Sequence, residues 1–394
     1  MKLLIGGSPC THWSIAQTKN RETDPEGIGW ELFENYLIAL EKFKPDFFLY
    51  ENNKSMAPAI RAQITRELGV EPILINSALM SAQNRQRLYW TNIPGVEQPE
   101  DRGIVLRDIL ESGVCWREKA YTLMASHERS VVNAIARNGK FPFNGAAEPV
   151  RIGTIESGTQ TNHDSKPFRV YSPDGKGVTL QGEAGGYGAK TGLYAVPVNP
   201  SEFAGEGAVY PITFDAEGQM QAEIEGRQRV IYEVQDGRIT IKGEQYPVKL
   251  AGGFYIIRKL TVLECKRLQT VPDSYIFPVS DTQAYRQLGN GWTVDVIAHI
   301  LHYAPRITEE PLEVLSMYDG MSCGHLALDN LGAHIAHYYA TEIDKYAVQT
   351  TQHNFPDTIQ LGDAFQVRDD GWSLPGTDIS GGSKSAGCMK VVTS

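Results

Sequence analysis

Two side chains capable of nucleophilic and acid–base chemistry follow two apolar segments near the N-terminus. Cys10 closes the segment GGSPC, directly after the apolar residues 2–5 (KLLI), and Glu51 ends the apolar segment 47–51 (FFLYE). If both segments are neighbouring parallel strands, the thiol and the carboxyl lie at the edge where open α/β sheets place their ligand sites. Taken alone, a small buried cysteine and a solvated strand-end acid are the alternative interpretations.

A thiol and a carboxyl placed in this way could act together on the ring of a cytosine. The C5 atom of cytosine is not nucleophilic until a thiolate adds to C6, and a carboxyl at N3 promotes that addition by hydrogen bonding or protonation. The product is an enamine whose C5 can take up a methyl group. The hypothesis assigns the thiolate to Cys10 and the carboxyl to Glu51.

Two arginines follow in the segment QNRQR at 83–87. Arg85 and Arg87 would lie on the same side of an extended backbone, because side chains two residues apart in a strand share a face. Their guanidinium groups suit a phosphate, a carboxylate or the O2 atom of a base. A surface ion pair is the alternative for either arginine alone.

The elements that must position these groups alternate along the first hundred residues. Apolar side chains at helical spacing predict a helix at 29–43, between strands at 2–5 and 47–51. A second helix is expected at 78–87 (ALMSAQNRQR) and a further strand at 88–93 (LYWTNI). Such alternation is typical of a parallel, doubly wound α/β sheet, and residues 1–102 are interpreted as its first part.

The character of the sequence changes further along the chain. Residues 103–257 combine glycine-rich loops with short segments such as RVIYEV, RITIKG and GFYIIR, which predicts a separate, smaller and mostly β domain. Residues 258–372 return to helices and strands, and residues 373–394, rich in Gly and Ser, predict a flexible tail. In the third part, helices are expected at 260–269, 293–304 and 325–332, and strands at 313–318, 337–343 and 358–363.

The composition is that of a globular protein, and a length of 394 residues favours two domains. No segment approaches the roughly 18 apolar residues of a membrane span, and the start MKLLIGGSPC is too short for a signal peptide. We therefore expect a cytoplasmic protein that does not enter a membrane. The five cysteines lack the spacing of zinc ligands, so no metal is expected.

The formal net charge of −10 argues mildly against a nucleic acid as partner, because phosphate contacts need clustered Lys and Arg. A local basic cleft would satisfy that need. Besides Arg85 and Arg87, the candidate groups are Arg227, Arg229, Arg238, Arg258, Lys259, Lys266 and Arg267.

Five ordered segments resemble the serial motifs of DNA cytosine-C5 methyltransferases. They are GGSPC at 6–10, ENN at 51–53, QNRQR at 83–87, RKLTVLECKRLQTVPDSY at 258–275 and LGNGWTV at 288–294. Three cofactor motifs of the same family come last instead of first, namely SMYDGMSCG at 316–324, TEIDKYA at 341–347 and LGD at 361–363. The chain thus resembles a circularly permuted member, and its motifs are similar to those of the de novo animal enzymes.

The resemblance implies a Rossmann-like, S-adenosylmethionine-dependent methyltransferase sheet with a smaller, mostly β target-recognition domain. It implies Cys10 as the nucleophile, Glu51 as the partner of N3, and Arg87 with Arg85 bracing the base and the active-site loop. S-Adenosylmethionine is the implied cofactor, with the adenine near Tyr318, the methionine part at the 319–324 turn and the ribose on Glu342. The implied cofactor-binding residues are Tyr318, Asp319, Gly320, Met321, Gly324, Glu342, Ile343, Asp363, Ala364, Asn290 and Trp292.

The implied partner is duplex DNA with a flipped-out cytosine, and no protein partner is indicated. The resemblance implies DNA contacts by Ser14 and Gln83, and residues 11–29 as a mobile loop that closes on DNA. Residues 103–257 would read the target in the major groove with loops from Thr179 to Lys190.

The sequence departs from the family pattern in three places. Asn53 puts an amide where a small apolar residue normally packs, so activity requires that the amide find partners. The loop after Cys10, THWS, lacks the glutamine common in bacterial enzymes. SMYDGMSCG lacks the paired glycines of their first motif, although it fits the de novo type.

Three other functions are weighed against this one. A dehydrogenase is disfavoured because no GxGxxG opens a helix. An RNA cytosine-C5 methyltransferase would use the same chemistry, but the long insert at 103–257 favours duplex DNA. A catalytically inactive DNA-binding relative is disfavoured by the presence of Cys10, Glu51 and Arg87.

The tail contains an echo of the nucleophile segment. TDISGGSKSAGC at 377–388 resembles KLLIGGSPC at 2–10. Trimming after a tandem duplication would leave such a second copy at the C-terminus. Chance similarity is the alternative, because loops favour Gly and Ser in any case. Residues 2–6 already fill the strand position, so we expect the tail to lie outside the sheet and Cys388 to lack a catalytic partner.

Overall fold

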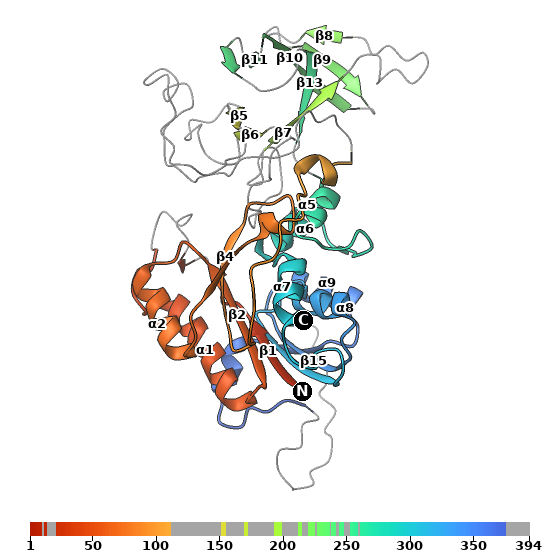
Figure 1. Ribbon diagram of the computed structural model, residues 1–394. Helices are drawn as coiled ribbons and strands as arrows, with labels where there is room; N and C mark the ends of the chain where they lie inside the picture. The colour runs from red at the N-terminus through yellow and green to blue at the C-terminus, as the bar shows by residue number, and fades with distance from the viewer. Residues whose placement is uncertain are drawn as a thin grey trace.

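The computed structural model describes residues 1–9, 12–13, 21–111 and 261–375, and between them the strands β5 to β13 within residues 151–258. The expectations for Cys10, Ser14, Thr179, Lys190, Cys388 and the tail beyond 375 lie outside the described residues. Figure 1 shows a sheet wrapped by helices and, at the other end of the picture, the second group of strands.

A seven-stranded sheet organises the first and last parts of the chain, in the order β16-β15-β14-β1-β2-β4-β3. All neighbouring strands are parallel except at β4, which runs antiparallel to both β2 and β3. The last three strands of the chain and its first four thus form two adjacent blocks, which meet at the pairing of β14 with β1. The strands are β1 (Lys2–Gly6), β2 (Phe47–Asn53), β3 (Ile73–Asn76), β4 (Gln86–Thr91), β14 (Leu312–Met317), β15 (Ile335–Thr341) and β16 (Ile359–Gly362).

Helices cover both faces of this sheet, because its strands are apolar on both faces. In β1, Leu3 and Ile5 belong to one buried cluster and Leu4 to the other, as the two-residue period of a strand requires. α1 and α2 cover the Leu4 face, and α5 to α8 cover the face of Ile5. The helices are α1 (Ile28–Phe43), α2 (Pro58–Leu68), α5 (Val262–Leu268), α6 (Asp281–Asn290), α7 (Val294–His302), α8 (Cys323–Leu331) and α9 (Lys345–Asn354), with short 3-10 helices η2 (Ser77–Leu79), η3 (Leu106–Ile109) and η5 (Ala364–Arg368).

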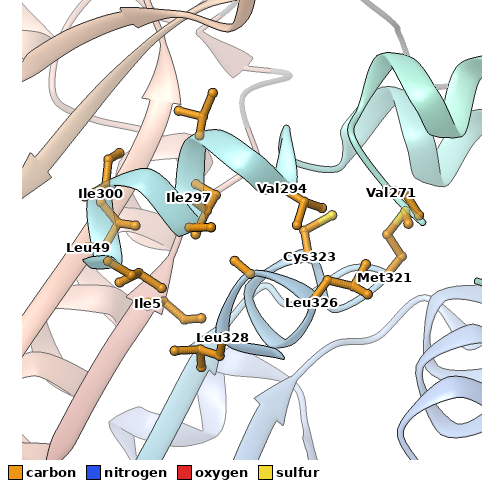
Figure 2. Packing of buried hydrophobic residues seen from close by; sticks show 14 of the residues in the cluster. Ile5, Leu49, Val271, Val294, Ile297, Ile300, Met321, Cys323, Leu326 and Leu328 are labelled. Carbon is orange, nitrogen blue, oxygen red and sulfur yellow. The ribbon is translucent and has the colours of Figure 1, made fainter. Parts of the chain in front are cut away.

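The core joins segments that are far apart in the sequence. Figure 2 shows Ile5 and Leu49 of the first strands packed beside Ile297 of α7 and Leu328 of α8. Gly324 permits this packing, since a Cβ atom there would lie 2.2 Å from Cδ1 of Ile5. This glycine therefore serves the contact between helix and sheet.

The described strands β5 to β13 form a second, nine-stranded sheet, as the β-like segments predicted, whereas Leu106 and Ile109 of the expected domain 103–257 pack in the core of the first sheet. The path of the second sheet is β12-β11-β10-β13-β7-β6-β5, with β9 pairing β10 and β8 pairing β9, and β6–β7 is its one parallel pair among the described strands. The strands are β5 (Arg151–Thr154), β6 (Arg169–Tyr171), β7 (Leu193–Val198), β8 (Ile212–Phe214), β9 (Met220–Ile224), β10 (Arg227–Gln235), β11 (Arg238–Ile241), β12 (Glu244–Pro247) and β13 (Gly253–Arg258).

The helix expected at 78–87 is wrong. Only Ser77–Leu79 form one 3-10 turn, capped by the side chain of Asn76, and the chain then passes through an irregular loop into β4. The Asn76 side chain also accepts from the backbone N–H of Arg85, and Ser77 N–H donates to the carbonyl of Arg85. These bonds close a loop where the local spacing of apolar residues predicts a helix. The sheet is also mixed instead of all-parallel, because β4 runs antiparallel to its neighbours.

The other expected elements are found within a few residues of their predicted bounds, whereas α2, β3, α6 and α9 were not predicted. Across the described part of the chain, no helix is long and apolar enough to cross a bilayer. Nor do three or more His, Cys, Asp or Glu side chains in that part gather as metal ligands would.

Candidate active site at the carboxyl edge of the sheet

The site begins where β1 ends, between β14 and β2. Gly6 pairs with Met317 on one side and Tyr50 on the other. Gly7 then passes so close to β2 that a Cβ atom would lie 2.7 Å from the Glu51 carbonyl oxygen and 3.0 Å from its Oε2. Only glycine leaves room for the Glu51 side chain here.

Glu51 is buried to 8% exposure, and each of its carboxylate oxygens has a donor. Arg87 Nε lies 2.9 Å from Oε1, and Trp292 Nε1 donates to Oε2 at 2.9 Å. Arg87 reaches Glu51 because the β2–β4 register pairs Asn53 with Arg87 and Glu51 with Tyr89, which places both side chains on one face as diagonal neighbours. The carboxyl plane is therefore fixed from two sides.

The two asparagines after Glu51 are both satisfied inside the protein. Asn52, 1% exposed, donates from Nδ2 to the Ser8 carbonyl at 3.2 Å, and Ser8 Oγ bonds Tyr50 Oη at 2.7 Å. Asn53 donates to Oδ1 of Asn52 and accepts from Ser55 Oγ at 2.7 Å. The partners that the Asn53 amide was expected to require are present, and Asn52 ties the GGSPC turn to β2.

Arg85 and Arg87 do not act side by side. Arg85 is 3% exposed, and its guanidinium donates to the carbonyl oxygens of Gly289 and Gly291 at 3.2 and 3.0 Å. The two groups diverge because Arg85 precedes β4, whereas Arg87 is part of it. Arg85 thus braces the turn after α6, and Arg87 pairs with the carboxylate of Glu51.

Gln83 is fully buried, which corrects the expected DNA contact. Its Nε2 donates to the Leu268 carbonyl at 3.2 Å and to Oε1 of Gln269 at 3.0 Å. Gln269 in turn donates to the carbonyls of Leu288 and Gly291. The Gln83 amide therefore belongs to an internal network that holds the turn after α6.

The loop expected at 11–29 is anchored at both of its described ends. Trp13 is completely buried and donates from its indole to Oε2 of Glu22 at 3.0 Å, while Glu22 Oε1 accepts from the backbone of Gly29 at 3.2 Å. Arg21 donates to the Ser55 carbonyl at 2.6 Å. The bonds of Glu22 to Trp13 and Gly29 lie within the expected loop, whereas the bond of Arg21 to Ser55 ties the loop to the segment after β2. The mobility of residues 11–29 stays a prediction.

The cofactor motif after β14 forms a tight turn with unusual backbone. Tyr318, Gly320 and Ser322 have φ values of 61°, 60° and 59°, and left-handed residues other than glycine, here Tyr318 and Ser322, concentrate at functional sites. Asp319 is the buried centre of this turn, accepting from Ser316 and Tyr338 at 2.7 and 2.8 Å and also from Ser322. Burial raises the pKa of Asp319, which these hydrogen bonds oppose.

The carboxylate of Glu342, directly after β15, is oriented by three backbone N–H groups. Glu342 accepts from Gly320 through Oε2 at 2.8 Å, and from Ile343 and Asp344 through Oε1 at 2.8 and 2.7 Å. Beside it the apolar side chain of Ile343 is 76% exposed. Asp363, exposed after β16, caps η5, whose first residue Ala364 is buried.

Not every residue expected at the cofactor faces an open site. Met321 is 1% exposed within the core, and its carbonyl accepts from Tyr275 Oη, so this residue does not line an open site. Gly324 serves helix packing. Asn290 is exposed at the end of α6, whereas Trp292 turns its indole N–H to Glu51. Ser8, Asn52 and Gln269, which the motifs alone did not single out, complete the network.

Part of the expected basic cleft is engaged within the protein. Lys266 donates to the carbonyls of Asp273 and Tyr275 at 2.6 and 3.0 Å, and Arg267 pairs with Asp273 at 2.7 Å. Burial lowers the pKa of Lys266. These two cations hold the segment after α5 in place.

Comparison with known proteins gives consistent matches. The model of the family described as C-5 cytosine-specific DNA methylase matches residues 1–304. The orphan methyltransferase M.SPRI of Bacillus phage SPR is 25% identical over 374 residues, covering 76% of this chain and 81% of the phage protein. The type II methyltransferase M.HpaII of Haemophilus parainfluenzae is 47% identical over 79 residues, which are 18% of this chain and 20% of that protein. The solved structure of the methyltransferase EhMeth from Entamoeba histolytica has a TM-score of 0.40 at 14% identity, over 76% of each chain.

Proposed function

Since this chain belongs to the C-5 cytosine-specific DNA methylase family, we propose that it transfers a methyl group from S-adenosylmethionine to C5 of a flipped-out cytosine in duplex DNA. The observation that carries the proposal is the carboxylate of Glu51, held by Arg87 and Trp292 directly beside the glycine turn that leads to Cys10. A buried, oriented carboxyl next to a cysteine-bearing turn is what addition to a pyrimidine ring requires.

The carboxyl edge of β14 to β16 fits the cofactor. Glu342 is aimed as an acceptor for ribose hydroxyls, Ile343 offers an exposed apolar face to an adenine, and Asp363 is exposed nearby for its amino group. A Cβ atom at Gly320 would meet nothing within 4 Å, so the backbone there can approach a ligand. When bound, S-adenosylmethionine supplies the electrophilic methyl group.

The protein's own groups divide the chemistry on the base. The thiolate of Cys10 forms a bond to C6, and the electrons of the C5–C6 double bond move toward C5 as Glu51 gives a proton or a hydrogen bond to N3. After C5 has been methylated, removal of its proton returns electrons to the ring and expels the thiolate. Arg87 orients Glu51 throughout, and extrusion of the base from the duplex brings it within reach.

We propose a circular permutation as the origin of the chain order. The family match ends at residue 304, and the strands that carry the cofactor motifs, β14 to β16, follow after it. In the sheet these last strands lie beside β1, which carries the GGSPC turn. This adjacency of the last strands and the first supports a chain opened between the third cofactor strand, β16, and the nucleophile strand, β1.

Target choice is expected to reside in residues 103–257. Exchanging this segment for the corresponding segment of another family member should change which cytosines are methylated, because the β domain is separate from the catalytic sheet. Bisulfite sequencing of DNA from cells that express each protein measures the change. If the protein with the exchanged segment is active but still methylates the original site, specificity lies elsewhere in the chain. If RNA is methylated and DNA is not, the protein is an RNA cytosine-C5 methyltransferase instead.

Gly7→Ala is expected to lower the turnover rate by about 10-fold or more while S-adenosylmethionine binding is retained, because the new Cβ atom would lie 2.7 Å from the Glu51 carbonyl oxygen and 3.0 Å from its Oε2, so that the turn and the carboxyl must shift apart. Single-turnover methylation and cofactor titration measure the two quantities. Gly371→Ala is the matched control, since a Cβ atom there meets nothing within 4 Å. Equal turnover of both variants would show that the position of Glu51 tolerates a shift.

A further inference from the structure

We propose that Trp292 is a positioning residue for the Glu51 carboxyl, so that the turn after α6 controls the acid that acts on the base. This role rests on the proposed function and differs from the cofactor contact implied by the family resemblance. Trp292 Nε1 lies 2.9 Å from Oε2 of Glu51, across 241 positions of sequence.

The contact matters because Glu51 is buried and has little freedom to replace a lost donor with water. At 8% exposure, the carboxylate depends on Arg87 at Oε1 and Trp292 at Oε2. A carboxylate has about four lone-pair sites, so these two partners fix its plane and still leave sites for the N3–H that proton transfer creates and for the exocyclic amine of a cytosine. Removing the indole N–H frees the carboxyl to rotate about its remaining contact with Arg87.

The indole is itself held by a rigid turn. Arg85 donates to the carbonyls of Gly289 and Gly291, and Gln269 donates to those of Leu288 and Gly291. Gly291 is confined as well, since a Cβ atom there would lie 3.1 Å from Cys323 Sγ in the helix that follows the cofactor turn. Arg85 and Gln269 therefore act on Glu51 through Trp292, and the same turn abuts the cofactor edge.

The test is a double-mutant cycle between Trp292 and Glu51. Trp292→Phe keeps an aromatic ring but removes the indole N–H, and we expect it to lower single-turnover methylation by about 10- to 100-fold, the range of a lost hydrogen bond to a buried charge. The affinity for S-adenosylmethionine is expected to change by less than about 3-fold. In the Glu51→Ala background, which has no acceptor for the indole N–H, the same substitution should lower the residual rate by no more than about 2-fold.

Trp90→Phe is the matched control, because Trp90 is also buried and donates its indole N–H, here to Thr65 Oγ1 at 3.0 Å on α2. It should leave the rate within about 2-fold of the wild type. The proposal is overturned if Trp292→Phe keeps its full effect in the Glu51→Ala background, if it acts only through cofactor affinity, or if it unfolds the protein. If the wild type methylates DNA but Trp292→Phe matches Trp90→Phe, only this inference fails; a wild type that methylates no cytosine removes the proposed function itself.

Discussion

Cys10→Ser should reduce methyl transfer by at least about 100-fold while leaving the binding of DNA and S-adenosylmethionine largely intact. A serine hydroxyl has neither the thiolate population nor the nucleophilicity that addition to C6 requires. Methyl transfer from labelled cofactor to duplex DNA gives the rate, and titrations of DNA and cofactor give the two affinities. Retention of more than a few per cent of the wild-type rate would remove Cys10 from the mechanism.

Two controls separate this effect from a general loss of structure. Cys388→Ser is expected to leave the rate unchanged, because β1, which leads to the GGSPC turn, already occupies the position between β14 and β2. DNA with 5-fluorocytosine at the target should form a denaturation-resistant adduct with the wild type and none with Cys10→Ser, since fluorine cannot leave C5 as a proton does. Normal methylation without any such adduct would contradict the covalent route.

Glu51→Gln should lower the methylation rate by about 100-fold, because an amide cannot give a proton to N3. The substitution preserves the size of the side chain above Gly7 and can still accept from Trp292, so the turn and the sheet should remain folded. Single-turnover rates and the rate of adduct formation on 5-fluorocytosine DNA measure the loss. Both are expected to fall together, since N3 assistance acts on the addition of the thiolate.

Glu313→Gln is the matched control for this substitution. Glu313 lies at the opposite end of the sheet on β14, which β1 separates from β2, and it pairs there with His337 at 2.8 Å. Its amide variant should methylate DNA at the wild-type rate. A wild-type rate for Glu51→Gln would assign the N3 role to another group.

The strands that carry the site could be predicted because their signal is local. β1 and β2 are short apolar segments, and the glycines and acid that follow them mark the carboxyl edge. The helix at 78–87 was predicted wrongly because its apolar spacing is local, whereas the hydrogen bonds of Asn76 and Arg85 that close the loop depend on the folded chain. Tertiary bonds outweigh helix propensity here.

Side-chain partners were harder to predict than strand ends. The spacing of Arg85 and Arg87 suggested a shared face, but one guanidinium reaches a turn some 200 positions away while the other pairs with Glu51. The contact of Trp292 with Glu51 likewise joins segments that only the folded sheet brings together. Gln83 shows the same limit, since a polar residue within a basic motif proved to be fully buried.

The most direct test of the central claim is mass spectrometry of nucleosides after incubation with methyl-deuterated S-adenosylmethionine. Duplex DNA and RNA of matched sequence are offered in parallel, with Cys10→Ser as the negative control. If Cys10 drives methyl transfer to C5 of cytosine in DNA, the wild type yields deuterated 5-methyl-2′-deoxycytidine from DNA and Cys10→Ser yields none. Label in RNA alone, label on the exocyclic amine instead of C5, or equal label with Cys10→Ser would contradict that claim.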